Sequence, residues 1–150
     1  NTADAASMLI EYGYIYEPQF TNPAVRDLAL KDLAFQTYLG LQDFFDPSNT
    51  IDLANSYDTL VLPHEWRMPM SVKSPSSQDI FSLQTAFIYN GLYPPTKMGM
   101  NDCPRTGTMG ACTKASLNAF QKKYGITGEE GVVGPNTLNI LNREFGSKVD

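Results

Sequence analysis

Residues with reactive side chains are few in this chain: His64 is its single histidine, and Cys103 and Cys112 are its two cysteines. Glu65 follows His64, but no second histidine follows at the spacing of a zinc-protease helix. The sequence also contains no nucleophile elbow, phosphate-binding loop or dinucleotide fingerprint. We therefore predict a protein without catalytic activity, cofactor or metal, in which His64 lies at a surface or an interface.

The two cysteines flank one short segment rich in glycine and threonine, residues 104–111. Because no further cysteine or histidine lies beside them, a disulfide between Cys103 and Cys112 is the favoured interpretation, with two free thiols as the alternative. A bridge over so short a loop would stabilise the fold by about 2–3 kcal/mol. It would also favour an oxidising compartment, which means a secreted or cell-surface location.

An oxygen-rich stretch lies near the middle of the chain and contains Asp43, Asp46, Asn49, Asp52 and Asp58. Calcium prefers such ligands, but the spacing is not that of an EF-hand loop. Capping of a helix start by an aspartate or asparagine explains these residues more simply. We therefore predict no metal site here.

Composition restricts the class of protein further. Hydrophobic residues make up 42% of the 150 residues, which is typical of a globular chain. The 16 acidic residues outnumber the 11 lysines and arginines, so the formal net charge is -5. An acidic chain without a basic cluster is not expected to bind nucleic acid or an anionic membrane surface. No apolar stretch approaches the length needed to span a bilayer.

Three blocks of the sequence recur in the same order, which predicts a duplicated unit, with chance similarity as the alternative. The paired blocks are 9–14 with 87–92, 34–41 with 119–126, and 49–55 with 136–142. Apolar residues recur at helical spacing in each block. We therefore predict an all-α fold of two tandem three-helix units, at 1–60 and 78–150, joined by an extended connector rich in proline and serine at 61–77.

Glycines mark the expected helix ends. In the first unit we expect helices over about 5–12, 28–39 and 49–57, with Gly13 and Gly40 as stop signals. In the second unit, the expected helices are 80–90, 117–124 and 135–145. Asp32 interrupts the apolar stripe of the first unit, whereas Leu117 stands at the matching place in the second.

The second unit resembles the peptidoglycan-binding domain family over about residues 78–146. The residues that carry the resemblance are two glycine turns and a helix between them: Gly107, Gly110 and Thr113, then Phe120 and Gln121, then Gly131, Val133, Gly134, Pro135 and Thr137. Thr106 and Met109 depart from the aspartate and the aromatic residue of the family pattern. The first unit would be a degenerate copy, similar also to the helical prosegment of secreted metalloproteinases.

Most of the matched residues have a structural interpretation. Gln121 is expected to bond backbone in a turn, and the hydroxyls of Thr113 and Thr137 to bond N–H groups at helix starts. The motif therefore specifies the fold more strongly than it specifies a ligand.

The resemblance implies an extracellular, non-catalytic module that binds cell-wall peptidoglycan or a related glycan. The expected mechanism is binding in a shallow groove between helix starts, where unpaired N–H groups meet ligand oxygens. Tyr93, Arg105, Asn136 and Asn139 are the candidate contacts. The alternative is that Tyr93 covers the edge of the core and that the asparagines are simply solvated.

Two other functions remain open at this point. The fold could be a building block in an extracellular filament, envelope layer or virion, or the targeting part of a cell-wall hydrolase. The structural alternative is favoured by large apolar residues in expected loops, which predict a homo-oligomer formed through these loops and the connector. They are Tyr14, Tyr16, Phe20, Phe44, Phe45 and Trp66, the last of which we expect to be pinned on one of the units.

Overall fold

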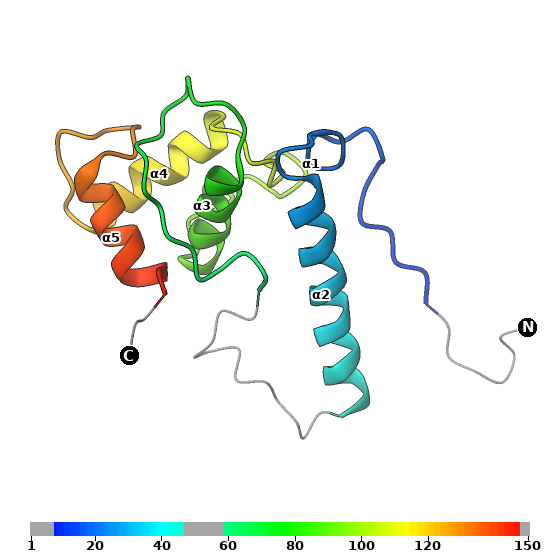
Figure 1. Ribbon diagram of the computed structural model, residues 1–150. Helices are drawn as coiled ribbons and strands as arrows, with labels where there is room; N and C mark the ends of the chain where they lie inside the picture. The colour runs from blue at the N-terminus through cyan, green and yellow to red at the C-terminus, as the bar shows by residue number, and fades with distance from the viewer. Residues whose placement is uncertain (1–7, 47–58, 148–150) are drawn as a thin grey trace, which may run out of the picture.

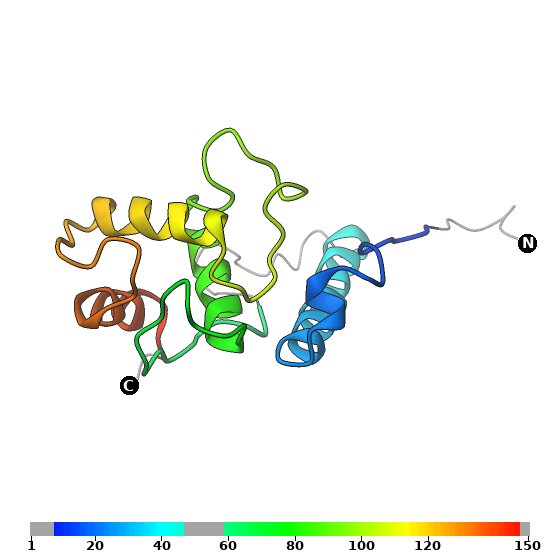
Figure 2. The ribbon, with the colours of Figure 1, turned by 90° about the horizontal axis from the view of Figure 1, so that it is seen from above.

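The computed structural model describes residues 8–46 and 59–147, which form five helices and no strand (Figure 1). This confirms the all-α class for the described residues. The helices are α1 (Pro18–Thr21), α2 (Arg26–Phe45), α3 (Gln78–Tyr89), α4 (Ala111–Lys123) and α5 (Pro135–Phe145). Helices α3, α4 and α5 gather into one unit, and α2 stands beside it (Figures 1 and 2).

The three-helix unit α3–α5 encloses the main apolar core. Residues at helical spacing on each helix meet there, as the sequence predicts, and Phe120 of α4 is 0% exposed. The Phe87 and Phe120 rings pack with their centroids 5.3 Å apart. Ser77 caps α3 by accepting the N–H of Ile80, and Pro135 begins α5, where its missing N–H costs nothing.

A buried glutamine fixes the turn between α3 and α4. Gln84 accepts the N–H of Gly107 through Oε1 at 2.9 Å and donates to the Thr113 hydroxyl at 2.8 Å. The φ of Gly107 is 71°, which favours glycine. The Thr113 hydroxyl donates in turn to the Thr108 carbonyl at 3.0 Å. The expectation that Thr113 bonds N–H groups of its own helix start is therefore wrong, because Gln84 and the turn carbonyl occupy the hydroxyl.

The same arrangement recurs between α4 and α5. Gln121 accepts the N–H of Gly131 at 3.2 Å and donates to the Thr137 hydroxyl at 3.1 Å. It also donates to the carbonyls of Glu129 and Val132, at 2.7 and 2.8 Å, which confirms its predicted bonding to a turn. We call each arrangement a Gln–Gly–Thr clamp. The two clamps make an internal repeat that lies within the three-helix unit.

The segment from 59 to 77 contains no helix and is held against α3 and α5. The Trp66 indole donates to the Asp79 carbonyl at 2.9 Å, and the side chain of Asn142 pairs with both the N–H and the carbonyl of Trp66. His64 lies 2.8 Å from the Asp79 carboxylate. The prediction that Trp66 is pinned on a unit is confirmed, and His64 lies at the contact between this segment and α3.

The N-terminal part differs from its predicted three-helix form. The expected helix over 5–12 is wrong for residues 8–12, which form no helix and are exposed. A short stretch whose apolar side chains stay exposed buries too little surface to stabilise a helix. Helix α2 continues through Gly40 to Phe45, because one glycine costs a helix about 1 kcal/mol and does not end it. The helix expected over 49–57 lies outside the described residues.

The residues paired by the predicted duplication also have different environments. Phe120 lies in the main core, whereas Phe35 is partly buried on α2 and belongs to neither apolar cluster. Leu117 is a core residue, whereas Asp32 is part of a buried polar network. The tandem arrangement of two units is therefore not confirmed.

Candidate functional site

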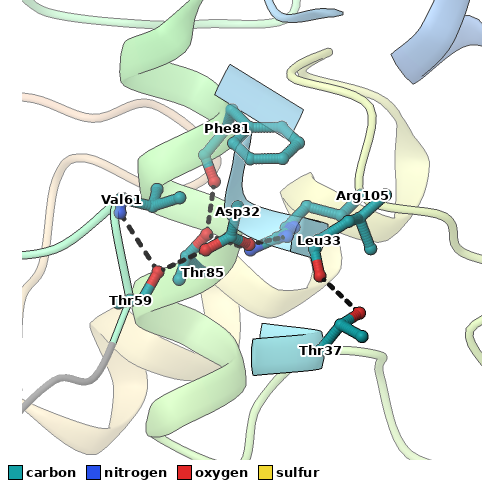
Figure 3. Close-up of polar contacts among 8 residues, drawn as sticks. All are labelled: Asp32, Leu33, Thr37, Thr59, Val61, Phe81, Thr85 and Arg105. Carbon is teal, nitrogen blue, oxygen red and sulfur yellow. Dashed lines mark hydrogen bonds and ion pairs between the residues drawn. The ribbon is translucent and has the colours of Figure 1, made fainter. Parts of the chain in front are cut away.

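Arg105, a predicted ligand contact, joins α2 to the three-helix unit (Figure 3). Its guanidinium forms an ion pair with Asp32 of α2, whose side chain is 2% exposed. The other carboxylate oxygen of Asp32 accepts the Thr59 hydroxyl at 2.7 Å, and Thr59 accepts the N–H of Val61 at 3.1 Å. The ion pair therefore links α2, the segment after residue 58 and the loop between α3 and α4.

The second half of the guanidinium is held by α3. Arg105 donates to the Thr85 hydroxyl at 2.9 Å, and that hydroxyl donates to the Phe81 carbonyl at 2.9 Å. The guanidinium carbon also lies 4.2 Å from the centre of the Phe81 ring, in the range of a cation–π contact. Arg105 thus makes contacts that hold elements of the fold together.

Tyr93 is buried, with 5% of its surface exposed. Its hydroxyl donates to the Pro104 carbonyl at 3.0 Å. Burial raises the pKa of Tyr93, although the Thr113 hydroxyl and the Arg105 charge act to lower it. This geometry agrees with the interpretation in which Tyr93 covers an edge of the core.

Beside Tyr93, Cys103 and Cys112 form a disulfide, which confirms their predicted pairing. Cys103 is fully buried in the main core cluster. The bridge ties the loop between α3 and α4 to the first turn of α4.

The two asparagines come together at an exposed pocket between the end of α4 and the start of α5. Its volume is about 370 Å³, and its lining is Gly125, Ile126, Thr127, Asn136, Asn139 and Ile140. Asn136 and Asn139 are three positions apart on α5, so their side chains share one face of the helix. Amide and hydroxyl groups beside isoleucine side chains suit a neutral polar ligand. Neither Tyr93 nor Arg105 lines this pocket.

The helix start nearest this pocket is already occupied. Glu129 accepts the N–H groups of Asn136 and Thr137 at 2.8 and 2.9 Å, and the Thr137 hydroxyl at 2.7 Å. Burial raises the pKa of Glu129, but these bonds and one from the Gly134 N–H outweigh it and leave the pKa below its ordinary value. The predicted binding to unpaired N–H groups is therefore wrong at α5, because a carboxylate of the protein takes the ligand's place.

The described residues also lack two features, a cluster of metal ligands and a membrane-spanning helix. Residues 8–46 and 59–147 contain no group of three or more histidine, cysteine or acidic side chains placed to hold a metal ion. Within these same ranges, no helix combines the length and hydropathy required to cross a membrane.

Sequence reasoning missed Gln84 and Glu129, which hold the turns in place. Gln84 had a signal in the sequence. Gln84 follows a core leucine as Gln121 follows Phe120, and the pattern Gly-x-x-Gly-x-x-Thr occurs at both 107–113 and 131–137. Comparing the two turns within the second unit, rather than the two halves of the chain, would have found the repeat that the structure contains.

Three helices, two clamped glycine turns and an exposed polar pocket make up a small helical module. Residues 76–141 match the family model described as "Putative peptidoglycan binding domain". This confirms the family resemblance inferred from the glycine turns. No curated protein and no solved structure matches the chain.

Proposed function

We propose that this protein binds cell-wall peptidoglycan, or a related glycan, at the pocket formed by the end of α4 and the start of α5. The observation that carries the proposal is the match of residues 76–141 to a peptidoglycan-binding family, since those residues include the whole pocket. The proposed activity is equilibrium binding without catalysis.

The chemistry of the pocket supports a neutral, hydroxyl- and amide-rich ligand. The side-chain amides of Asn136 and Asn139 each offer donors and an acceptor, and Thr127 adds a hydroxyl. Ile126 and Ile140 supply apolar contact area for a sugar ring or a peptide side chain. A volume of about 370 Å³ is within the usual range for ligand pockets, so one or two units of a polymer would fit.

Retention on purified cell-wall sacculi tests this proposal. We expect the protein to sediment with sacculi, and N136A and N139A each to weaken binding by about 3–10-fold, the effect of losing one net hydrogen bond. The matched control is N118A, which removes an exposed asparagine of α4 outside the pocket. Absence of retention, or equal weakening by N118A, would contradict the proposal.

We also propose a secreted or cell-surface location. The Cys103–Cys112 disulfide supports it, because such bonds persist in oxidising compartments. Thiol alkylation and mass spectrometry of the protein from its native source should show both cysteines protected. Free thiols in that material would place the protein in a reducing compartment.

A structural role in an extracellular assembly is the second candidate. The observation that favours it is the set of large apolar side chains that α2 and the preceding segment expose. Formation of filaments or sheets by the purified protein, seen by negative-stain electron microscopy, would support this role.

A further inference from the structure

Helix α2 is apolar on two opposite faces. One face meets the three-helix unit, where Ala29 and the paired Asp32 are buried, together with Val25 just before the helix. The opposite face is exposed, and Phe44 and Phe45 at its end are 71% and 78% exposed. An amphipathic surface helix normally carries apolar residues on a single face, so the second face of α2 is not needed for its packing against the described residues of the three-helix unit.

The exposed face has the spacing of a helix–helix seam. Leu30, Ala34, Thr37, Leu41 and Phe44 alternate in steps of four and three positions. Alternation of this kind places side chains in one stripe that packs against a second helix. Tyr38 and Phe45 flank the stripe, and both are exposed.

The segment before α1 turns this stripe into a groove. The Tyr12 hydroxyl bonds the Thr37 hydroxyl, which holds the segment beside α2 on the side away from the three-helix unit (Figures 1 and 2). The resulting groove has a volume of about 700 Å³. It is lined by Met8, Ile10, Thr37, Gly40, Leu41, Phe44 and Phe45.

We define the α2 apolar surface as the exposed apolar side chains on and beside this groove: Met8, Ile10, Leu30, Tyr38, Leu41, Phe44 and Phe45. With their fractional exposures, these side chains present on the order of 800 Å² to solvent, since a large aromatic side chain alone offers about 150–250 Å². A monomer rarely exposes such a patch, and this area equals one side of a standard protein interface of roughly 800 Å² per partner.

We propose that the α2 apolar surface is the interface between two copies of this chain, related by a two-fold axis. Phe44 and Phe45 both line the groove and are largely exposed, so each of two copies related by a two-fold axis can place these side chains against the groove of the other, as a self-complementary contact requires. The residues of the polar pocket on α5 lie outside this surface. A dimer would therefore keep two pockets accessible and, given the proposed function, would gain avidity for a polymer.

Sedimentation velocity over a wide range of protein concentration tests the dimer without any polymer. We expect the mass to rise from one chain to two, and L41E to raise the dissociation constant by at least about tenfold, the effect of disrupting a central interface residue. The control is M68E, which places the same charge at a residue that is 66% exposed outside this surface.

Far-UV circular dichroism and Trp66 fluorescence show whether each variant is folded, and F44S near the end of α2 replaces L41E if that variant unfolds. A protein that stays monomeric at every concentration overturns the proposal. The occupant of the α2 apolar surface would then be either residues 47–58 of the same chain or a lipid surface, and binding of the monomer to phosphatidylcholine vesicles would indicate the second. A dimer that M68E weakens as much as L41E and F44S do also overturns it.

Discussion

The three-helix unit and helix α2 illustrate two ways in which an amphipathic sequence can be held in a fold. In the unit, α3, α4 and α5 share one core, and a Gln–Gly–Thr clamp fixes each turn. Helix α2 instead attaches to the three-helix unit through a small apolar cluster that includes Phe81 of α3 and through the ion pair of Asp32 with Arg105 in the loop between α3 and α4. Similar apolar patterns thus produced different environments. Buried glutamines and glycine turns hold the helices of the three-helix unit together, and the described residues around α2 contain no such arrangement.

The largest expected difference between the regions concerns Phe120 and Phe35. We expect F120A to lower the free energy of unfolding by about 3–5 kcal/mol, as for other fully buried phenylalanines. F35A should cost roughly 1 kcal/mol, because the side chain is partly exposed and outside both clusters. Urea denaturation followed by Trp66 fluorescence and circular dichroism measures both. Equal losses would restore the predicted equivalence of the two residues.

The two clamp glycines sharpen the comparison, because Gly107 lies beside Val25, the residue that precedes α2. A methyl group on Gly107 would lie 2.5 Å from Val25 Cγ1 and 2.9 Å from the Ser77 carbonyl oxygen. On Gly131, the nearest atom would be the flexible Lys114 Cε at 2.7 Å. We expect about 1–2 kcal/mol of destabilisation from the left-handed backbone in G131A, and about 2–4 kcal/mol in G107A, where overpacking adds to it.

Thermal and urea unfolding of both glycine variants gives the measurement. A G131A variant less stable than G107A would contradict the assignment of Gly107 to the contact between α2 and the unit.

Removal of Asp32 should weaken the attachment of α2 while leaving the three-helix unit folded. Breaking a buried pair often costs 3–5 kcal/mol, but Arg105 is 17% exposed and keeps Thr85 and Phe81, so we expect about 2–3 kcal/mol for D32A. Hydrogen exchange should accelerate in α2 and stay slow in α3–α5. The control is D27A, whose exposed ion pair with Arg26 contributes little. Uniform acceleration across all helices would show that α2 belongs to the same cooperative unit.

The smallest predicted effect lies within the clamped unit. Because the folded pKa of Glu129 is lowered, its contribution to stability is present above the unfolded pKa and is lost as the pH falls through the folded pKa. We expect E129Q to cost about 1 kcal/mol at neutral pH, similar to the loss of a helix cap. The difference between wild type and E129Q should shrink below about pH 4, near the ordinary pKa of glutamate. A difference that stays constant with pH would contradict this role.

The predictions for α3 and α5 succeeded because local rules determine that region, whereas α4 begins at Ala111, six residues before the expected start at 117. Apolar spacing, Pro135 and the glycine turns each specify a helix or its boundary without reference to distant residues. The Cys103–Cys112 pair followed from spacing for the same reason. Helix α2 was predicted in position but not in length, because a glycine marks a helix end only where the chain also turns away.

The sequence by itself thus determined the helical class, the resemblance of residues 76–141 to a peptidoglycan-binding family model and the disulfide. Only the tertiary structure decided that Arg105 pairs with Asp32, that Tyr93 is buried and that Asn136 and Asn139 share a pocket. The physical reason is the sequence separation of the residues that interact. Helix periodicity and turn conformation depend on neighbours in the chain, whereas the pairing of Asp32 with Arg105, 73 positions away, depends on how separate helices pack.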